Sequence, residues 1–257
     1  MNENKPLIFL TNDDGIEAPG LNYLIETVKD MGRLVVFAPC VSQSGKSSAI
    51  TVDQPLRVIN YPSKYENIEM KGVTGTPVDC VKLGLYLLGQ ERPALLLSGV
   101  NHGSNSSFNL IYSGTMGAVL EGCMAGIPSI GFSLLHHSWK ADFSECGAVI
   151  RKIVGDVLKK DLPNDVCLNV NIPARCTPKG IKVTEASYGH WTEEYTPMVD
   201  PHGRTHYWLS GQFIDDDPDN INTDNYWLNQ QFATVVPVRP DQTSQASIPV
   251  IKEILGL

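Results

Sequence analysis

The sequence predicts an α/β fold with a doubly wound, mostly parallel sheet. Short apolar runs occur at Leu7–Leu10, Leu34–Phe37 and Ala94–Leu97 without polar alternation, which is typical of parallel strands covered by helices on both faces. Amphipathic helical segments separate the runs along the chain. Strands that alternate with helices indicate βαβ units, and therefore a Rossmann-like sheet with right-handed crossovers.

The first half of the chain follows this alternation. A stripe of apolar residues predicts a helix over Leu21–Met31, and a polar loop follows the second run. Three shorter strands, some forming a side hairpin, are predicted at Ile50–Val52, Leu56–Ile59 and Ile68–Val73. Thr76 has the pattern of a helix N-cap with Pro77 at the first helical position. Asp79 then occupies the third position, which favours a structural capping-box role over a catalytic one.

The second half of the predicted core continues the pattern. A helix begins near Ser113-Gly114-Thr115 and ends before Pro128. A strand at Ser129–Ser133, a helix over Phe143–Lys159 and a strand at Cys167–Ile172 follow. We expect this α/β catalytic core to span residues 1–180.

Residues 181–257 form the remainder of what we expect to be one domain overall. After a strand at Ile181–Ala186, the segment Ser187–Phe232 is polar, punctuated by prolines and rich in aromatic residues. It has too little periodic apolar content for its own core, so we expect an extended β-hairpin arm that reaches over another subunit. The alternative is a loop that folds back on its own domain. A strand at Phe232–Val238 and a helix at Ile248–Leu255 end the chain.

Composition limits the partners. The 257 residues carry a formal net charge of −8, which argues against a nucleic-acid polymer or an anionic membrane surface. The apolar runs are all shorter than the roughly 20 residues of a membrane span. The six cysteines include no Cys-x-x-Cys pair, so buried free thiols are favoured over zinc ligands or disulfides. A polar N-terminus without a signal-peptide pattern favours the cytoplasm.

Two adjacent carboxylates are the main candidate functional feature. Asp13 and Asp14 follow the first predicted strand, and Gly15 comes directly after them. Partly buried neighbouring carboxylates repel each other, and a hard divalent cation is the simplest compensation. Polar loops after two other strands contain Ser44 and Asn101, and such loops meet at the ligand-binding edge of an α/β sheet. Their oxygen donors suit magnesium, manganese or calcium.

A second feature suits a phosphate group. Ser113, Gly114 and Thr115 start a helix, where backbone N–H groups and the helix dipole attract anions. A plain N-cap explains Ser113 equally well. Lys46 has two interpretations, an anion-steering group or a solvated loop lysine. A metal beside a phosphate site indicates phosphoester hydrolysis, with one aspartate available as general base.

A set of motifs in order along the chain resembles the survival protein SurE family. The resemblance covers nearly the whole chain and is carried by Thr11-Asn12-Asp13-Asp14-Gly15, Ala38-Pro39 with Ser44-Gly45, Gly75-Thr76-Pro77, Ser98-Gly99-Val100-Asn101, Tyr112-Ser113-Gly114-Thr115, Glu121-Gly122, Leu168-Asn169-Val170-Asn171-Ile172-Pro173, Asp200-Pro201-His202-Gly203 with Tyr207-Trp208, and Thr223-Asp224. The ordered set is far more specific than any single motif.

The resemblance implies a phosphatase of nucleoside monophosphates that depends on one divalent cation per subunit, Mg²⁺ or Mn²⁺. The resemblance also implies activity on 3′-nucleotides and short polyphosphate. It further implies a homodimer or homotetramer whose subunits exchange their C-terminal arms. By position it implies catalytic roles for Asp13 and Asp14. The implied metal ligands are Asp13, Asp14, Ser44 and Asn101, and the implied substrate-binding residues are Asn101, Ser113, Gly114 and Thr115.

Two departures from the family pattern concern loop geometry and substrate preference, and neither falls on a residue implied to bind the metal. Cys40 stands where an aspartate usually follows Ala-Pro, and Ser106-Ser107-Phe108 replaces a stretch that commonly contains glycine and an acidic residue. Two other classes of function compete with the enzyme. A phospho-receiver module also has paired acids after its first strand, but it needs an aspartyl acceptor where this chain has Ser98 and Asn101. A nucleotide-binding module without turnover is the other alternative.

Overall fold

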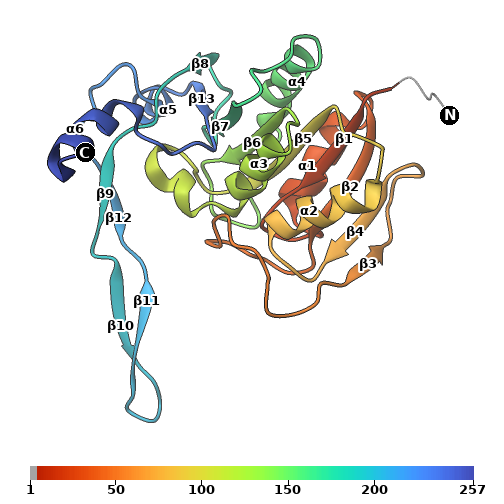
Figure 1. The fold of residues 1–257 in the computed structure, drawn as a ribbon. Coiled ribbons are helices and arrows are strands. Elements are labelled where there is room, and N and C mark those ends of the chain that lie inside the picture. Colours follow the sequence, from red (N-terminus) through yellow and green to blue (C-terminus); the bar gives the residue numbers. More distant parts are fainter. Residues whose placement is uncertain (1–4) are drawn as a thin grey trace.

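The computed structural model describes residues 5–257, and a nine-stranded sheet forms the centre of that part of the chain (Figure 1). The strands lie in the order β3-β4-β2-β1-β5-β6-β7-β13-β8. Their bounds are β1 (Leu7–Thr11), β2 (Arg33–Pro39), β3 (Val58–Tyr61), β4 (Glu69–Val73), β5 (Leu95–His102), β6 (Ser129–Leu134), β7 (Cys167–Ile172), β8 (Ile181–Val183) and β13 (Ala233–Val238).

Strand direction confirms the doubly wound, mostly parallel sheet. The neighbours from β4 through β2, β1, β5 and β6 to β7 pair in parallel. Only β3 against β4 and β13 against β7 are antiparallel among the pairs of this sheet, and β8 is parallel to β13. The strand order reverses between β1 and β5. After β1 the chain adds β2 and β4 on one side, and it then returns to add β5, β6 and β7 on the other side. Ligands of open α/β sheets bind at such a switch point.

Helices cover both faces of the sheet (Figure 1). The helices of this core are α1 (Pro19–Val28), α2 (Pro77–Leu88), α3 (Gly114–Met124) and α4 (Cys146–Val157), with a 3₁₀ helix η1 (Ser107–Tyr112) before α3. One buried apolar cluster joins α1 and α4 to the sheet, and a second cluster joins α2 and α3 to it. The two clusters hold side chains from alternate positions of the central strands, so both faces of the sheet are buried.

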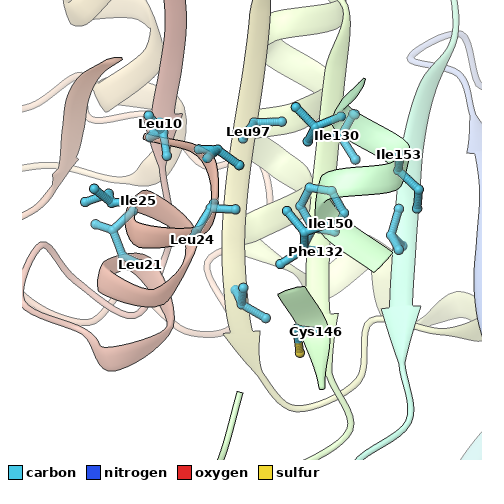
Figure 2. Packing of buried hydrophobic residues seen from close by; sticks show 14 of the residues in the cluster. Leu10, Leu21, Leu24, Ile25, Leu97, Ile130, Phe132, Cys146, Ile150 and Ile153 are labelled. Atoms are coloured by element: carbon cyan, nitrogen blue, oxygen red, sulfur yellow. The ribbon is translucent and has the colours of Figure 1, made fainter. Parts of the chain in front are cut away.

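Figure 2 shows the first cluster from close by. Leu21 and Leu24 of α1 belong to this cluster together with Leu97 of β5, and Phe132 of β6 lies beside Ile150 of α4. All five side chains are fully buried. Burial of a large apolar side chain contributes about 1.5–3 kcal/mol, so this layer holds β1, β5 and β6 firmly beneath the loops at their carboxyl ends.

The start of α2 confirms the predicted capping box. The Asp79 amide donates to Thr76 Oγ1 (3.1 Å), and the Thr76 amide donates to Asp79 Oδ2 (2.9 Å). Pro77 occupies the first turn. Asp79 therefore has the structural role that its spacing predicted.

The C-terminal segment contains a long antiparallel hairpin, as expected. Its strands are β9 (Gly189–Thr192), β10 (Tyr195–Val199), β11 (Thr205–Leu209) and β12 (Gln212–Asp215). Strand β9 pairs with β12, and β10 pairs with β11. These residues, 189–215, are referred to below as the arm, and they extend away from the core in Figure 1. The chain ends with α5 (Asp224–Asn229), β13, η2 (Gln245–Ser247) and α6 (Ile248–Leu255).

Several predicted elements were wrong in detail. Ile50–Val52 forms no strand, because Thr51 is bonded through its amide and hydroxyl to the Asp79 carboxylate (3.1 and 2.6 Å). The predicted loop Ser98–Asn101 belongs to β5, which continues to pair with β6 past an irregularity. The strand predicted at Ile181–Ala186 ends at Val183, and helix α5 was not expected.

In residues 5–257, no helix has the length and apolar character needed to cross a membrane. All six cysteines are free thiols. The buried ones are Cys80, Cys123, Cys146 and Cys167, whereas Cys40 and Cys176 are partly exposed.

Candidate active site

The loops after β1 and β2 are joined through their backbones. The amide of Gln43 donates to the carbonyl of Asp13 (2.7 Å), and the amide of Ile16 donates to the carbonyl of Pro39 (2.8 Å). Gly15 has a φ of +109°, a conformation that favours glycine, and this lets the chain turn sharply after the two aspartates. The aspartates therefore lie at the switch point between β1 and β5, beside the loop that carries Ser44.

Asp13 is a buried carboxylate whose negative charge is unfavourable in its surroundings. Only 3% of its surface is exposed, and its Oδ1 accepts a 2.5 Å hydrogen bond from Thr115 Oγ1. Burial, followed by the negative charge of Asp14, raises the pKa of Asp13 to about 6, although the Thr115 hydroxyl lowers it in part. A carboxylate that is costly to ionise favours a site where a cation compensates its charge.

Asp14 has a similar environment and different partners. Its Oδ2 accepts a hydrogen bond from the backbone amide of His102 (3.1 Å). Burial raises the pKa of Asp14, while that amide and the Ser44 hydroxyl lower it. Among the residues that the structure describes, neither Asp13 nor Asp14 forms an ion pair with a basic side chain.

The oxygen donors around the aspartates fit a hard divalent cation. Ser44 lies against Asp14, and Asn101 directly precedes the residue whose amide binds Asp14. The Asn101 amide nitrogen donates to the Gly103 carbonyl (2.9 Å), which leaves its amide oxygen as the end available to an ion. No cluster of three or more His, Cys, Asp or Glu side chains suited to a metal occurs in residues 5–257. Two carboxylates with neutral oxygen donors suit Mg²⁺ or Mn²⁺ better than a zinc site.

The N-terminus of α3 meets the aspartates. The Ser113 hydroxyl accepts a hydrogen bond from the Met116 amide (3.1 Å), which confirms its N-cap role. A Cβ added to Gly114 would come within 2.8 Å of the Asp13 Cβ, so only glycine permits this close approach. The hydroxyls of Ser113 and Thr115 are thus engaged within the protein. Of the N–H groups in this first turn, the Met116 amide is bonded to Ser113 and the Thr115 amide acts on Asp13, so the Gly114 amide remains for an anion.

The loop that carries Ser44 also contacts the segment before α3. The Ser47 amide donates to the carbonyl of Tyr112 (3.2 Å), and the Ser47 hydroxyl donates to that of Ile111 (2.5 Å). Lys46 therefore lies between Ser44, which contacts Asp14, and Ser47, which contacts the segment before Ser113. It is exposed, and within the described chain it forms no salt bridge.

His102 contributes its backbone and not its ring to the carboxylates. Its Nδ1 lies 2.9 Å from the Ser138 carbonyl, and its ring packs against Trp139 and Phe143. Burial lowers the pKa of His102, as does His137 to a smaller extent, whereas the Ser138 hydrogen bond raises it. Sequence reasoning missed the role of this amide, because a backbone donor leaves no signal in residue type.

Comparisons with known proteins agree with this arrangement. A sequence model described as survival protein SurE matches residues 8–193. A 5′-nucleotidase SurE of Phocaeicola vulgatus is 42% identical over 252 residues, which covers 98% of both chains. A 5′-nucleotidase SurE of Christiangramia forsetii is 45% identical over 248 residues, which covers 95% of both.

A solved structure matches the fold over nearly its full length. The crystal structure of the SurE protein from Aquifex aeolicus has a TM-score of 0.83 and 35% sequence identity, and the match covers 97% of this chain and 100% of that one. The family match spans well over half of the residues, and it includes the aspartates, the Ser44 loop and the start of α3. This chain belongs to the survival protein SurE family.

Proposed function

We propose that this protein is a phosphoric monoester hydrolase that acts on nucleoside 5′-monophosphates. The observation that carries the proposal is the contact between two buried aspartates and the N-terminus of an α-helix, joined by the 2.5 Å bond from Thr115 to Asp13. This contact combines a cation site and a phosphate site. Support also comes from relatives named 5′-nucleotidase SurE, which are 42–45% identical over nearly the whole chain.

The proposed enzyme uses one divalent cation per subunit, Mg²⁺ or Mn²⁺, held by Asp13, Asp14, Ser44 and Asn101. The raised pKa of both aspartates supports this assignment, since burial makes their negative charge costly without a cation. When bound, such a cation polarises a phosphoryl oxygen and lowers the pKa of a water molecule.

The residues of the chain perform the remaining tasks. The amide of Gly114 at the start of α3 donates to a non-bridging phosphoryl oxygen, and Asn101 contributes to substrate binding. Thr115 holds Asp13 in place through its hydroxyl. An aspartate oxygen accepts a proton from the attacking water. The new P–O bond forms as the ester P–O bond breaks, and the leaving nucleoside oxygen takes up the proton that the aspartate accepted from the water.

The finer parts of the proposal concern range and assembly. Activity on 3′-nucleotides and short polyphosphate would use the same site, because both present terminal phosphoryl groups. We propose an α/β core over residues 1–180 and a C-terminal part over 181–257 within one SurE-like domain. The exposed apolar side chains of the arm support a homodimer or homotetramer with exchanged arms. Free cysteines support a cytoplasmic location.

Phosphate release from a panel of substrates tests the activity. The panel comprises nucleoside 5′- and 3′-monophosphates and tripolyphosphate, each with Mg²⁺, with Mn²⁺ and with chelator. We expect release from the 5′-monophosphates that chelator abolishes and added metal restores. Absence of metal-dependent release across the panel would contradict the proposal and favour a nucleotide-binding module without turnover. Release from 5′-nucleotides alone would confine the substrate range to them.

A further inference from the structure

The segment between β5 and α3 contains a strained residue. Ser107, at the start of η1, has a φ of +54°, a left-handed conformation that L-residues other than Asn and Asp seldom adopt. It is fully buried. Such a backbone persists only where its surroundings hold it.

The carboxylate of Asp224 supplies that restraint from 117 residues further along the chain. Its Oδ2 accepts a 2.8 Å hydrogen bond from the Ser107 amide. Its Oδ1 accepts from the amide and hydroxyl of Ser187 (both 2.9 Å) and from the Asn225 amide (2.8 Å). Asp224 is fully buried and has no basic partner in the part of the chain that the structure describes. Neutral donors from three separate segments therefore satisfy one buried charge.

A second bond fixes the same loop. The Ser106 hydroxyl donates to Asn225 Oδ1 (2.8 Å), and Asn225 Nδ2 donates to Asp215 Oδ2 (2.9 Å). The N-cap and the first residue of η1 are thus held by two successive residues at the start of α5. Ser106 and Ser107 lie in the stretch that departs from the family pattern.

The position of η1 determines the position of the phosphate-binding helix. The 3₁₀ helix ends at Tyr112, directly before the N-cap Ser113. The close approach of Gly114 to Asp13 leaves little tolerance at this end of α3. A displacement of Ser107 would move the start of α3 relative to the aspartates.

We propose that Asp224 is a positioning residue for the phosphate site. By holding Ser107, it keeps η1 and the first turn of α3 at the place where the Gly114 amide meets a phosphoryl group. The proposal rests on the proposed function of that site. It assigns to the C-terminal segment an influence on phosphate binding that is separate from any role in assembly.

The variant Asp224→Asn separates this role from general stability. Asparagine keeps the shape of aspartate and offers one oxygen and one NH₂ group. The asparagine oxygen should take the position of Oδ1, because three donors point at that atom. The NH₂ group then takes the position of Oδ2 and faces the Ser107 amide, so that two hydrogen-bond donors oppose each other. The hold on η1 is then lost, while the contacts to Ser187 remain. Ser187→Ala is the matched control, because it removes one donor on the other side and leaves Ser107 bonded.

The experiment measures steady-state hydrolysis of a nucleoside 5′-monophosphate, inhibition by inorganic phosphate, and the Mg²⁺ concentration for half-activation. For Asp224→Asn we expect KM and the inhibition constant of phosphate to rise about ten-fold. This is the effect of weakening one hydrogen bond between the start of α3 and the phosphate. The Mg²⁺ requirement should change less than about two-fold, since the proposed ligands lie on other loops. Ser187→Ala should alter all three values less than about two-fold, even at an equal loss of thermal stability.

Equal effects of the two variants at equal loss of stability would overturn the positioning role and leave the hydrolase in place. A wild-type protein that neither hydrolyses the panel nor binds phosphate would overturn the proposed function itself. If Asp224→Asn does not fold, Ser106→Ala tests the same loop, with an expected rise of about three-fold in the phosphate inhibition constant. An unchanged constant in that variant would count against the proposal.

Discussion

The hydroxyl of Thr115 donates a 2.5 Å hydrogen bond to the carboxylate of Asp13, 102 residues earlier in the chain. This bond joins the first turn of α3 to the loop after β1. The backbone amide of Thr115 also acts on the Asp13 carboxylate, so one residue at the start of the helix links the candidate phosphate site to the candidate cation site.

Replacement of Thr115 by valine tests that link. Valine keeps the branched shape and removes the donor, so the Asp13 pKa should rise further and its orientation should loosen. A hydrogen bond to a charged group contributes about 1.5–3 kcal/mol, which predicts a fall in kcat/KM of about ten- to hundred-fold. Thr115→Ser keeps the hydroxyl and should retain most of the activity. Equal activity in the valine and serine variants would show that the bond has no part in catalysis.

Asp14→Asn should weaken the metal site and spare the fold. The amide keeps the size of the carboxylate and removes one negative charge from the proposed ligand set. We expect the concentration of Mn²⁺ for half-activation to rise at least about ten-fold, with a circular dichroism spectrum like that of the wild type. Full turnover by the variant at limiting Mn²⁺ would exclude Asp14 as a ligand.

The raised pKa of Asp13 predicts an unusual pH dependence for the metal-free protein. Its pKa is about 6 in the fold and 3.8 in the reference state, so the folded protein takes up the proton first as pH falls. The penalty for ionising Asp13 is present above about pH 6 and disappears toward about pH 4, so stability should increase by about 1 kcal/mol between pH 7 and 5. Thermal unfolding in chelator measures this.

Two comparisons isolate the effect of Asp13. The variant Asp13→Asn has no carboxyl proton to bind at this position, so its stability in chelator should vary less over the same pH range. Saturating Mg²⁺ should reverse the trend in the wild type, because protons then compete with the cation. A metal-free wild type that loses stability from pH 7 to pH 5 to the same extent as the variant would refute the assignment.

Lys46 lies between Ser44 and Ser47, whose contacts lead to the aspartates and to the segment before Ser113. If this lysine steers the phosphate, Lys46→Ala should raise KM about three- to ten-fold with kcat unchanged, as expected for a solvent-screened charge. The effect should diminish as ionic strength increases. Lys46→Arg, which keeps the charge, serves as control. A KM that is insensitive to both changes would identify Lys46 as a solvated surface residue.

Local patterns in the sequence predicted much of the fold. Continuous apolar runs identified β1, β2 and β5, because a parallel sheet buried on both faces leaves no polar positions in its strands. The capping box of Thr76 and Asp79 was predictable from spacing alone. The paired aspartates were evident as an electrostatic problem before any fold was known.

Other parts depend on contacts between distant segments, which residue patterns do not record. The left-handed Ser107 and its bond to Asp224 join residues 117 positions apart. The His102 amide that binds Asp14 is a backbone group, and every residue except proline has one. Helix α5 is six residues long within an aromatic segment, too short to show a periodic apolar stripe.

The last prediction concerns the arm. Strands β10 and β11 expose large apolar side chains on a hairpin that pairs with no other strand in residues 5–257. The exposed fractions are 64% for Tyr195, 68% for Tyr207 and 65% for Trp208. A two-stranded ribbon with these side chains in water gains little stability by itself, and burial against a second subunit would provide it.

Replacing residues 195–209 with a short turn should therefore reduce the mass measured by light scattering. The shortened protein should keep its far-ultraviolet spectrum, because the large sheet does not include these strands. An unchanged oligomer would show that the arm lies against its own subunit or stays in solvent, and would end the arm-exchange proposal.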